Sequence, residues 1–393
     1  MPLHILISGA GIAGLTFAYC CRRAGYSCTI VEKSGAVRPA GYMIDFFGSG
    51  YDAAERLGLL SDIEQIHYPI DKLSFVDSHG HERFALSYHA LRKIFYNRHF
   101  NFLRGDLERV LYSHVKDFAH FRFGVTIESI EQHTQEVIAH LSDGSSVHAD
   151  LLLGADGIHS RVRSLVFGEQ SRFLRFLGYN TAAYILPFLP SGLRSDNVFT
   201  TLTVPAHQVG LYPIRDGRLA AFFLYRAQNP PAAVDPAAGF EELRSAFSGA
   251  GWVVPRLFDG IEPGSFYFDQ VSQIEAPHWS RGRVILLGDA CYCVSLLAGQ
   301  GSSLAMAGAY VLAQKLQASA GDVAVAAAFY ENRLRPHVEK KQLAARKFAR
   351  WFVPASNAMI SARDSLMRLS NYSLFRPMVR RSFSPDSLFR GPA

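Results

Sequence analysis

The stretch that most constrains the fold is residues 3–34, near the start of the chain. A short apolar run at residues 5–7 leads into a glycine-rich turn, a helical pattern follows to about residue 24, and a second apolar run ends at Glu32. The glycines have the spacing Gly9-x-Gly11-x-x-Gly14. This order predicts a strand, a tight turn, a helix, a second strand and then an acid, which together begin an α/β domain.

Each glycine of this turn has a physical role in binding a dinucleotide. Gly9 permits the tight turn, Gly11 lets the backbone approach a pyrophosphate, and Gly14 lets the helix pack closely on the strand. The phosphates would lie on the open N–H groups at the positive end of the helix dipole. Glu32, 18 residues after Gly14, would accept hydrogen bonds from both ribose hydroxyls. The alternative is a tight turn that needs glycine for packing alone.

The length and composition favour a globular enzyme of two domains. A chain of 393 residues is long for one hydrophobic core. Hydrophobic residues make up 49% and charged residues 19%, which excludes a disordered protein. The net charge of +6 arises at the end of the chain, where residues 333–393 hold 13 Lys and Arg against 3 Asp and Glu. A basic face can contact lipid or nucleic acid, but we expect a solvated helical face and no nucleic-acid partner.

The cysteines and histidines do not suggest a metal site. The five cysteines, none with the spacing of metal ligands, are Cys20, Cys21, Cys28, Cys291 and Cys293. We expect buried, reduced thiols. The glycines interrupt the N-terminal apolar run, which does not fit a secretory signal, and no apolar run reaches membrane-spanning length. We therefore expect a cytoplasmic monomer without a membrane span.

Two later stretches repeat the pattern of a buried strand that ends in glycine and acid. The apolar residues 151–153 lead into Gly-Ala-Asp156-Gly-Ile-His-Ser-Arg161-Val-Arg163. This turn can place Asp156 beside a ribose or pyrophosphate and an arginine beside phosphate, or it can simply end a strand. The apolar residues 284–287 lead into Gly288-Asp289, and Gly299-Gln300-Gly301 then opens a helix at about 302–319. The N–H groups and dipole of that helix form a second site for negative charge.

A different pattern, alternation of period two, runs from about residue 172 to 273. It predicts strands at 179–188, 198–204, 208–212, 219–225 and 266–271, with one helix at 240–250, and a separate hairpin at 73–77 and 82–86. Because these strands lack βαβ alternation, we expect a mainly antiparallel sheet inserted into the dinucleotide domain. We place the dinucleotide domain at 1–72, 95–171 and 274–335, the substrate domain at 73–94 and 172–273, and a C-terminal helical segment at 336–393.

Several helices are expected between and after these stretches. Apolar spacing predicts helices at 51–60 and 107–115, the second with Asp106 as its N-terminal cap. In the C-terminal segment, helices are expected at 337–352 and 358–369, separated by Pro354. We expect the first of these to pack across both domains and the second to border the substrate opening.

Three motifs occur along the chain in this order: Gly9-x-Gly11-x-x-Gly14 with Glu32, the turn that contains Asp156, and Gly288-Asp289 followed by Gly299-Gln300-Gly301. Together they resemble the motifs of the single-component aromatic hydroxylases, the FAD-dependent monooxygenases of the p-hydroxybenzoate hydroxylase type. The resemblance covers roughly residues 3–316. It implies an α/β fold in which a glutathione-reductase-like FAD domain carries an inserted sheet domain, with the flavin ring between them. It also implies FAD as cofactor, NAD(P)H as transient reductant, molecular oxygen as co-substrate, and hydroxylation through a flavin C4a-hydroperoxide.

Within this family the chain is most similar to the tetracycline-inactivating flavin monooxygenases. The similarity lies in residues 41–48 (GYMIDFFG), in Gln273-Ile, in Trp279-x-x-Gly-Arg and in Gly-Asp-Ala-x-Tyr-Cys. The chain departs from many relatives at residues 293–296 (CVSL), where they have proline. Polyketide-tailoring hydroxylases carry the same motifs, so the substrate prediction is a polycyclic aromatic or enolic small molecule, with tetracyclines as candidates.

The motifs and the resemblance together predict a set of cofactor-binding residues. They are Gly9, Gly11, Ala13, Gly14, Glu32, Lys33, Arg38, Asp45, Arg104, Asp156, Asp289, Gly299, Gln300 and Gly301. By resemblance, Arg104 would reach the pyrophosphate or ribityl chain, Asp289 the ribityl hydroxyls, and Arg38 and Asp45 the nicotinamide cofactor and FAD.

We predict no catalytic side chain, because the cofactor carries the chemistry and the protein must position the substrate ring and exclude water. The helix N-terminus at 299–301 suits the negative charge of reduced flavin. Side chains that could face substrate, or could equally serve packing or the surface, are His207, Tyr212, Arg215 and Tyr225. Two alternatives remain open: a flavin oxidoreductase without hydroxylation, and a non-catalytic protein that sequesters an aromatic ligand.

Overall fold

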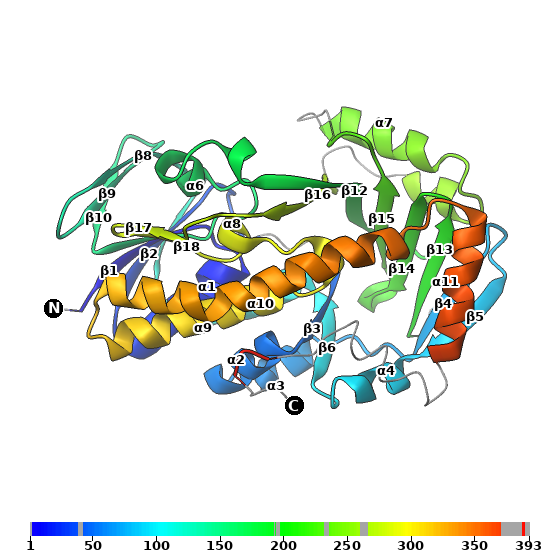
Figure 1. Cartoon of the computed structure of the whole chain (residues 1–393), viewed down its shortest axis with the longest axis horizontal. Coiled ribbons are helices and arrows are strands. Elements are labelled where there is room, and N and C mark those ends of the chain that lie inside the picture. The colour runs from blue at the N-terminus through cyan, green and yellow to red at the C-terminus, as the bar shows by residue number, and fades with distance from the viewer. Residues whose placement is uncertain are drawn as a thin grey trace.

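The computed structural model describes residues 2–37, 42–191, 193, 197–231, 236–259, 266–370 and 387–389. Its first sheet has six strands in the order β17-β18-β11-β1-β2-β7 (Figure 1). These strands are β1 (His4–Ser8), β2 (Ser27–Glu32), β7 (His120–Phe123), β11 (Leu151–Gly154), β17 (Ser280–Arg281) and β18 (Val284–Leu286). All neighbours are parallel except β17 and β18. The three predicted motifs therefore end at the same edge of one sheet, because parallel strands share their carboxyl ends.

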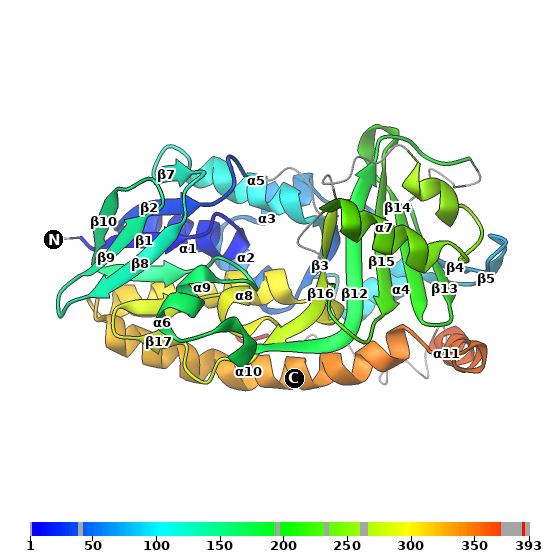
Figure 2. The same ribbon diagram turned by 90° about the horizontal axis from the view of Figure 1, so that it is seen from above.

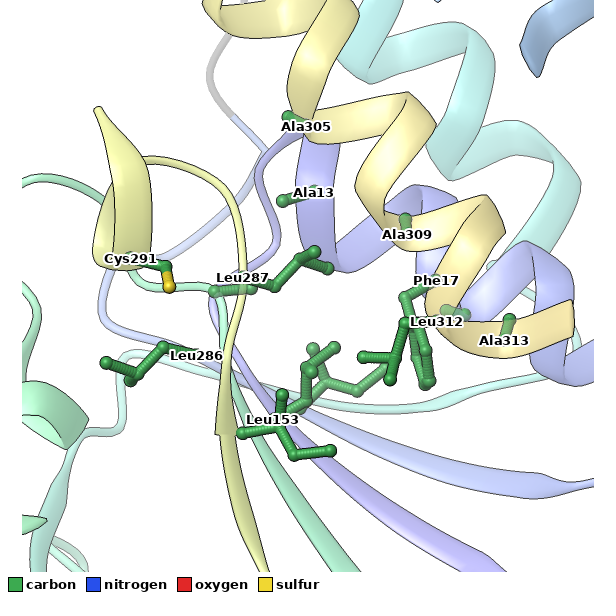
Figure 3. Packing of buried hydrophobic residues seen from close by; sticks show 14 of the residues in the cluster. Ala13, Phe17, Leu153, Leu286, Leu287, Cys291, Ala305, Ala309, Leu312 and Ala313 are labelled. Atoms are coloured by element: carbon green, nitrogen blue, oxygen red, sulfur yellow. The ribbon is translucent and has the colours of Figure 1, made fainter. Parts of the chain in front are cut away.

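Small residues allow two helices to pack closely on this sheet. Figure 3 shows Ala305, Ala309 and Ala313 of α9 (Gly301–Ala318) facing Ala13 and Phe17 of α1 (Ile12–Ala24). Leu153 and Leu287 complete the packing from the strand side. The sequences of these strands are continuous apolar runs because both faces of the sheet are buried. This packing fixes the N-termini of α1 and α9 at the carboxyl edge of the sheet.

The second large sheet has seven strands in the order β16-β12-β15-β14-β13-β4-β5. They are β4 (Lys72–Val76), β5 (Glu82–Ser87), β12 (Leu174–Leu186), β13 (Val198–Val204), β14 (His207–Pro213), β15 (Leu219–Arg226) and β16 (Tyr267–Ile274). Every neighbouring pair is antiparallel except β13 and β4. The hairpin of β4 and β5 thus joins the later strands in one sheet. Helix α7 (Pro236–Phe247) and the 3₁₀ helix η3 (Val254–Phe258) cover one face.

The remaining strands of the described residues form two smaller sheets. One is the antiparallel meander of β8 (Ile127–Gln132), β9 (Val137–Leu141) and β10 (Ser146–Ala149). The other pairs β3 (Met43–Phe47) with β6 (His99–Leu103) in antiparallel register, Asp45 opposite Asn101. Ile44, Phe46, Phe100 and Phe102 of this pair pack into the core of the first sheet. The opposite face carries Met43 and Leu103, which pack with Tyr212 of the second sheet.

The remaining helices lie around the first sheet and at the C-terminal end. They are α2 (Ser49–Leu57), α3 (Leu60–Gln65), α4 (Tyr88–Ile94), α5 (Arg104–Val115), α6 (Arg161–Val166), α8 (Asp289–Tyr292), α10 (Val323–Phe352) and α11 (Asn357–Ser370). In Figure 2, α10 runs along the first sheet's side of the molecule and ends beside the second sheet, where α11 follows. Arg226 of β15 donates to the Val353 carbonyl at 2.8 Å and so attaches the end of α10 to that sheet.

Two local predictions were wrong. The helix predicted at 51–60 is two helices, α2 and α3, because Gly58 ends α2 with φ +77. Asp106 does not cap α5, because that helix begins at Arg104 and Asp106 lies inside its first turn, where it pairs with Arg109. Among the helices in the described ranges, none combines the length and the hydropathy needed to span a membrane.

Candidate FAD and substrate site

The three glycines of the first turn have different surroundings. Gly9 has φ +106, and a Cβ there would lie 2.5 Å from the Ala155 carbonyl oxygen. A Cβ on Gly14 would overlap the Gly9 carbonyl oxygen. Packing alone explains why positions 9 and 14 require glycine. A Cβ on Gly11 would meet only the tips of Glu108 and Arg104, at 3.6 and 3.7 Å. Gly11 is therefore the glycine whose presence points to a ligand that approaches the backbone.

Glu32 lies over this turn, as the sequence predicts. Its Oε2 accepts a hydrogen bond from the Ala10 N–H at 2.9 Å, and its Oε1 accepts one from the Ser34 N–H at 2.8 Å. The acid is therefore held at the end of β2 beside the N-terminus of α1. Lys33, the next residue, has an exposed side chain.

Arg104 and Asp289 extend the site from the first turn to α9. Arg104 lies 2.9 Å from Glu108 of the same helix. A Cβ added to Gly301 would lie 3.7 Å from Asp289 Oδ1. Desolvation raises the pKa of the Asp289 carboxyl, and the Arg104 guanidinium opposes that shift. No side chain caps the N-terminus of α1 or of α9 within the described residues, so their first amides are available to an anion.

The turn after β11 is used for internal contacts. Asp156 accepts hydrogen bonds from the Ser160 hydroxyl at 2.5 Å and from the N–H groups of Arg161 and Val162 at 2.7 and 3.0 Å. Arg163 is 0% exposed and donates to the carbonyls of Ala290 and Ile158 at 2.8 and 2.7 Å. The prediction of a phosphate contact is therefore wrong for Arg163, which instead ties this turn to the Asp289 turn. The contact of Asp156 with cofactor stays a prediction.

Asp45 lies at the centre of a hydrogen-bonded cluster that the sequence did not reveal. Its Oδ1 is 2.9 Å from the Tyr88 hydroxyl, 2.5 Å from Asn101 Nδ2 and 3.0 Å from His99 Nε2. Although desolvation favours the neutral acid, the hydrogen bond and charge of His99 and the other two donors hold the pKa of Asp45 below its usual value. The side chain is nevertheless 52% exposed. Asp45 is thus an ionised and accessible carboxylate on the face of β3 that is turned toward the second sheet.

The face of the second sheet that is turned toward β3, here called the inner face, is aromatic. The ring of Tyr42 lies 6.3 Å from that of Phe222 and 5.8 Å from that of Tyr267. Phe199 lies across Gly210, where a Cβ would come within 2.8 Å of its ring. Desolvation raises the pKa of Tyr42 and of Tyr267, so both phenols are neutral at physiological pH. The inner face thus offers flat apolar surfaces and neutral hydroxyls.

Two of the four candidate substrate residues lie on the face of the second sheet that α7 covers, here called the outer face. His207 and Tyr225 pack against Phe247 of α7, with ring centroids 5.1 and 5.8 Å away, and the Tyr225 hydroxyl donates to Glu242 at 2.6 Å. They belong to the outer face, because side chains alternate along a strand and Phe222 marks the inner one. Of the two roles left open by the sequence, these contacts favour packing for both residues.

The other two have positions that favour structural roles. Tyr212 lies on the inner face but is buried, with its hydroxyl 3.4 Å from the Pro69 carbonyl. Arg215 donates to the carbonyls of Gln65 and His67 at 3.0 and 3.2 Å. Phe222 and Tyr267 are the inner-face residues that sequence reasoning missed, and the parity of the strands relative to α7 would have identified them. Arg38 lies outside the described residues.

A cavity of about 660 Å³ lies between β12, β15 and the second half of α10. Its lining includes Arg175, Arg226 and Arg346 and contains none of the predicted site residues. The carboxyl edge of the first sheet, and not this cavity, therefore defines the candidate site.

Comparison with known proteins identifies the class. A family model described as the FAD binding domain matches residues 3–340. The chain is 34% identical over 343 residues to a flavin-dependent monooxygenase of an unknown prokaryotic organism, covering 86% of this chain and 87% of the relative. It is 32% identical over 356 residues to a flavin-dependent monooxygenase of Legionella longbeachae, covering 89% and 88%. The crystal structure of tetracycline destructase Tet(55) matches with a TM-score of 0.83 at 29% identity, over 99% of both chains.

The fold and the turns at the carboxyl edge are those of an FAD-dependent monooxygenase of the p-hydroxybenzoate hydroxylase type, which confirms the predicted resemblance. The chain belongs to the FAD-binding family of these enzymes, with FAD as cofactor and NAD(P)H as reductant. The fold class is likewise confirmed: an α/β FAD-binding fold with further sheets and C-terminal helices. A non-catalytic flavin-fold protein is thereby disfavoured.

Proposed function

We propose that this monooxygenase hydroxylates a flat polycyclic aromatic or enolic substrate and that tetracyclines are its substrates. The observation that carries the proposal is the aromatic inner face, where Phe222 and Tyr267 meet Tyr42 opposite the carboxylate of Asp45. A planar ring system gains most from such surfaces, because aromatic rings stack face to edge or offset. The likeness to tetracycline destructase Tet(55) supports the choice of substrate.

The cofactor-binding residues belong to the same proposal. The surroundings of Gly11 fit a group that approaches the backbone at the N-terminus of α1. Gly11 would hold the pyrophosphate, Glu32 the ribose, and Arg104 and Asp289 the chain that leads to the flavin. Residues 299–301 would lie beside the ring, where the uncapped N-terminus of α9 offers N–H donors to negative charge.

The chemistry divides between cofactor and chain. When bound, FAD supplies the reduction and activation of dioxygen, for which no side chain is suited. The chain holds the substrate ring on the inner face and keeps water away from it. Asp45 can accept a hydrogen bond from a phenol or enol hydroxyl, because its lowered pKa keeps it ionised. A hydroxyl polarised in this way makes the neighbouring ring carbon more electron-rich.

The C-terminal helices complete the proposal. Arg363 of α11 donates to the Thr203 hydroxyl of β13 at 3.1 Å and pairs with the neighbouring Asp364. Met367 packs with Phe75 and Phe84 of the same sheet. On this basis we propose that the described residues 336–370 of the C-terminal segment border the substrate opening.

The test is NADPH consumption by the purified FAD-loaded protein, with and without a tetracycline, followed by mass spectrometry of the product. Substrate-dependent consumption and a product that has gained one oxygen atom are the expected results. No stimulation by any tetracycline would remove these substrates and direct the search to other polycyclic polyketides. Stimulated consumption without oxygen in the product would contradict hydroxylation of the tetracycline tested.

A further inference from the structure

The loop at residues 293–300 joins the Asp289 turn to the N-terminus of α9. It contains the 3₁₀ helix η4 (Leu296–Ala298) and no proline. Its conformation determines where residues 299–301 lie relative to Asp289. Within it, Ser295 has φ +82 and ψ +151. Backbone in this region is essentially restricted to glycine, and other residues persist there only when surrounding contacts hold them.

Two buried glutamines supply such contacts. Gln342 of α10 donates from Nε2 to the Cys293 carbonyl at 3.1 Å and to the Ile274 carbonyl at 2.8 Å. Gln273 of β16 donates from Nε2 to the Val294 carbonyl at 3.1 Å and to the Gln342 carbonyl at 2.9 Å. Gln273 and Gln342 are 0% and 6% exposed. The two carbonyls directly before Ser295 are therefore each held by a buried amide.

Other contacts fix the glutamines and the far side of the loop. Arg346, one turn after Gln342, donates to Gln273 Oε1 at 2.7 Å. Leu297 packs with Ala349 of α10 and with Val353. The Ser295 hydroxyl is buried and has no hydrogen-bond partner within the described residues, so the serine side chain does not stabilise its own conformation. The Ser295 carbonyl accepts a hydrogen bond from the Ala298 N–H at 3.1 Å inside the loop, and the two glutamines restrain the backbone that precedes Ser295.

We propose that Gln342 and Gln273 are positioning residues that clamp this loop in its strained conformation, so that α10 sets the geometry of the FAD-facing loop. The inference rests on the FAD-binding role of residues 289–301 and not on the identity of the substrate.

The experiment replaces Gln342 by Met, which keeps the length of the side chain and removes both donors. The matched control is Gln314→Met, the same change at an exposed position of α9. In FAD-loaded protein, hydrogen exchange of residues 293–299 should become roughly five- to tenfold faster in Q342M, the equivalent of about one net hydrogen bond. More NADPH should then be consumed without hydroxylated product. Q314M should leave the exchange unchanged.

A second substitution separates positioning from simple packing of α10. Ser295→Gly removes the backbone strain, because glycine, which has no Cβ, adopts this conformation without a steric clash. In the Q342M background, S295G should slow loop exchange and restore much of the coupling of NADPH use to product. A lowered melting temperature of Q342M with unchanged loop exchange would overturn the proposal. Failure of S295G to restore any protection would also overturn it. Because exchange is measured without substrate, neither result depends on the tetracycline proposal.

Discussion

The two halves of the site are built from different parts of the chain. The cofactor half uses backbone: glycines at strand ends, and the open amides of α1 and α9. The substrate half uses side chains that alternate along strands, with Phe222 on one face and Phe223 on the other. A site built from backbone depends on the conformations that the glycine turns can adopt. A site built from side chains depends on which face of the sheet each side chain occupies. Substitutions in the backbone site should abolish FAD binding, and substitutions in the side-chain site should change the affinity for substrate.

The largest effect is expected for Gly14→Ala. The added methyl group would overlap the Gly9 carbonyl oxygen and approach Ile7 within 3.1 Å, so either the turn or α1 must move. We expect a loss of at least about 3 kcal/mol of stability, the upper range for overpacking, and no retained FAD. Flavin content of the purified protein measures the effect. Gly249→Ala, where nothing lies within 4 Å, is the control and should retain FAD fully.

The neighbours Phe222 and Phe223 test the two faces of the second sheet. Phe223→Ala opens the fully buried cluster under α7 and should cost about 3–5 kcal/mol of unfolding free energy, with an unchanged KM. Phe222→Ala should destabilise less and raise the substrate KM about tenfold, equivalent to the loss of about 1.4 kcal/mol of binding. Urea unfolding and steady-state kinetics measure both. A raised KM for Phe223→Ala alone would reverse the assignment of faces.

Arg104→Met should weaken FAD binding by about 10- to 100-fold, the contribution of a hydrogen bond to a charged group. The change also removes the ion pair of Arg104 with the buried Glu108 at 2.9 Å, which lowers stability independently. Adding Glu108→Gln to the Arg104→Met variant should recover stability but not the affinity for FAD. If the double variant binds FAD as tightly as the unmodified protein, Arg104 does not contact the cofactor.

The smallest effect concerns His159, which lies 3.2 Å from Asp269. This hydrogen bond raises the pKa of His159 in the folded chain, with desolvation and Lys33 opposing the shift. Its stabilisation is therefore fully present below the unfolded value of about 6.5 and is lost as pH rises through the folded pKa. His159→Gln should lower the melting temperature slightly at about pH 5.5 and hardly at all at about pH 8.5. An equal loss at both pH values would contradict the assignment.

The contrast between the halves also explains what could be predicted from sequence. The turns at Gly9, Asp156 and Asp289 can be located from the sequence because each follows a short apolar run and contains glycine. Strand positions in the second sheet were also predicted closely. The direction of each side chain was not, because both faces of that sheet are covered and apolar, and Tyr225 and Phe222 look alike in a sequence. The clustering of Tyr88, His99 and Asn101 around Asp45 depends on strand pairing between distant segments, which no local pattern reports.

The most direct test of the central claim is a crystal structure of the FAD-loaded enzyme with a tetracycline bound. The account predicts the pyrophosphate against Gly11, a ribose hydroxyl on Glu32, and the substrate ring on the inner face beside Phe222 and Tyr267. Cofactor bound away from the N-terminus of α1, or substrate bound on the α7 side of the sheet, would contradict it.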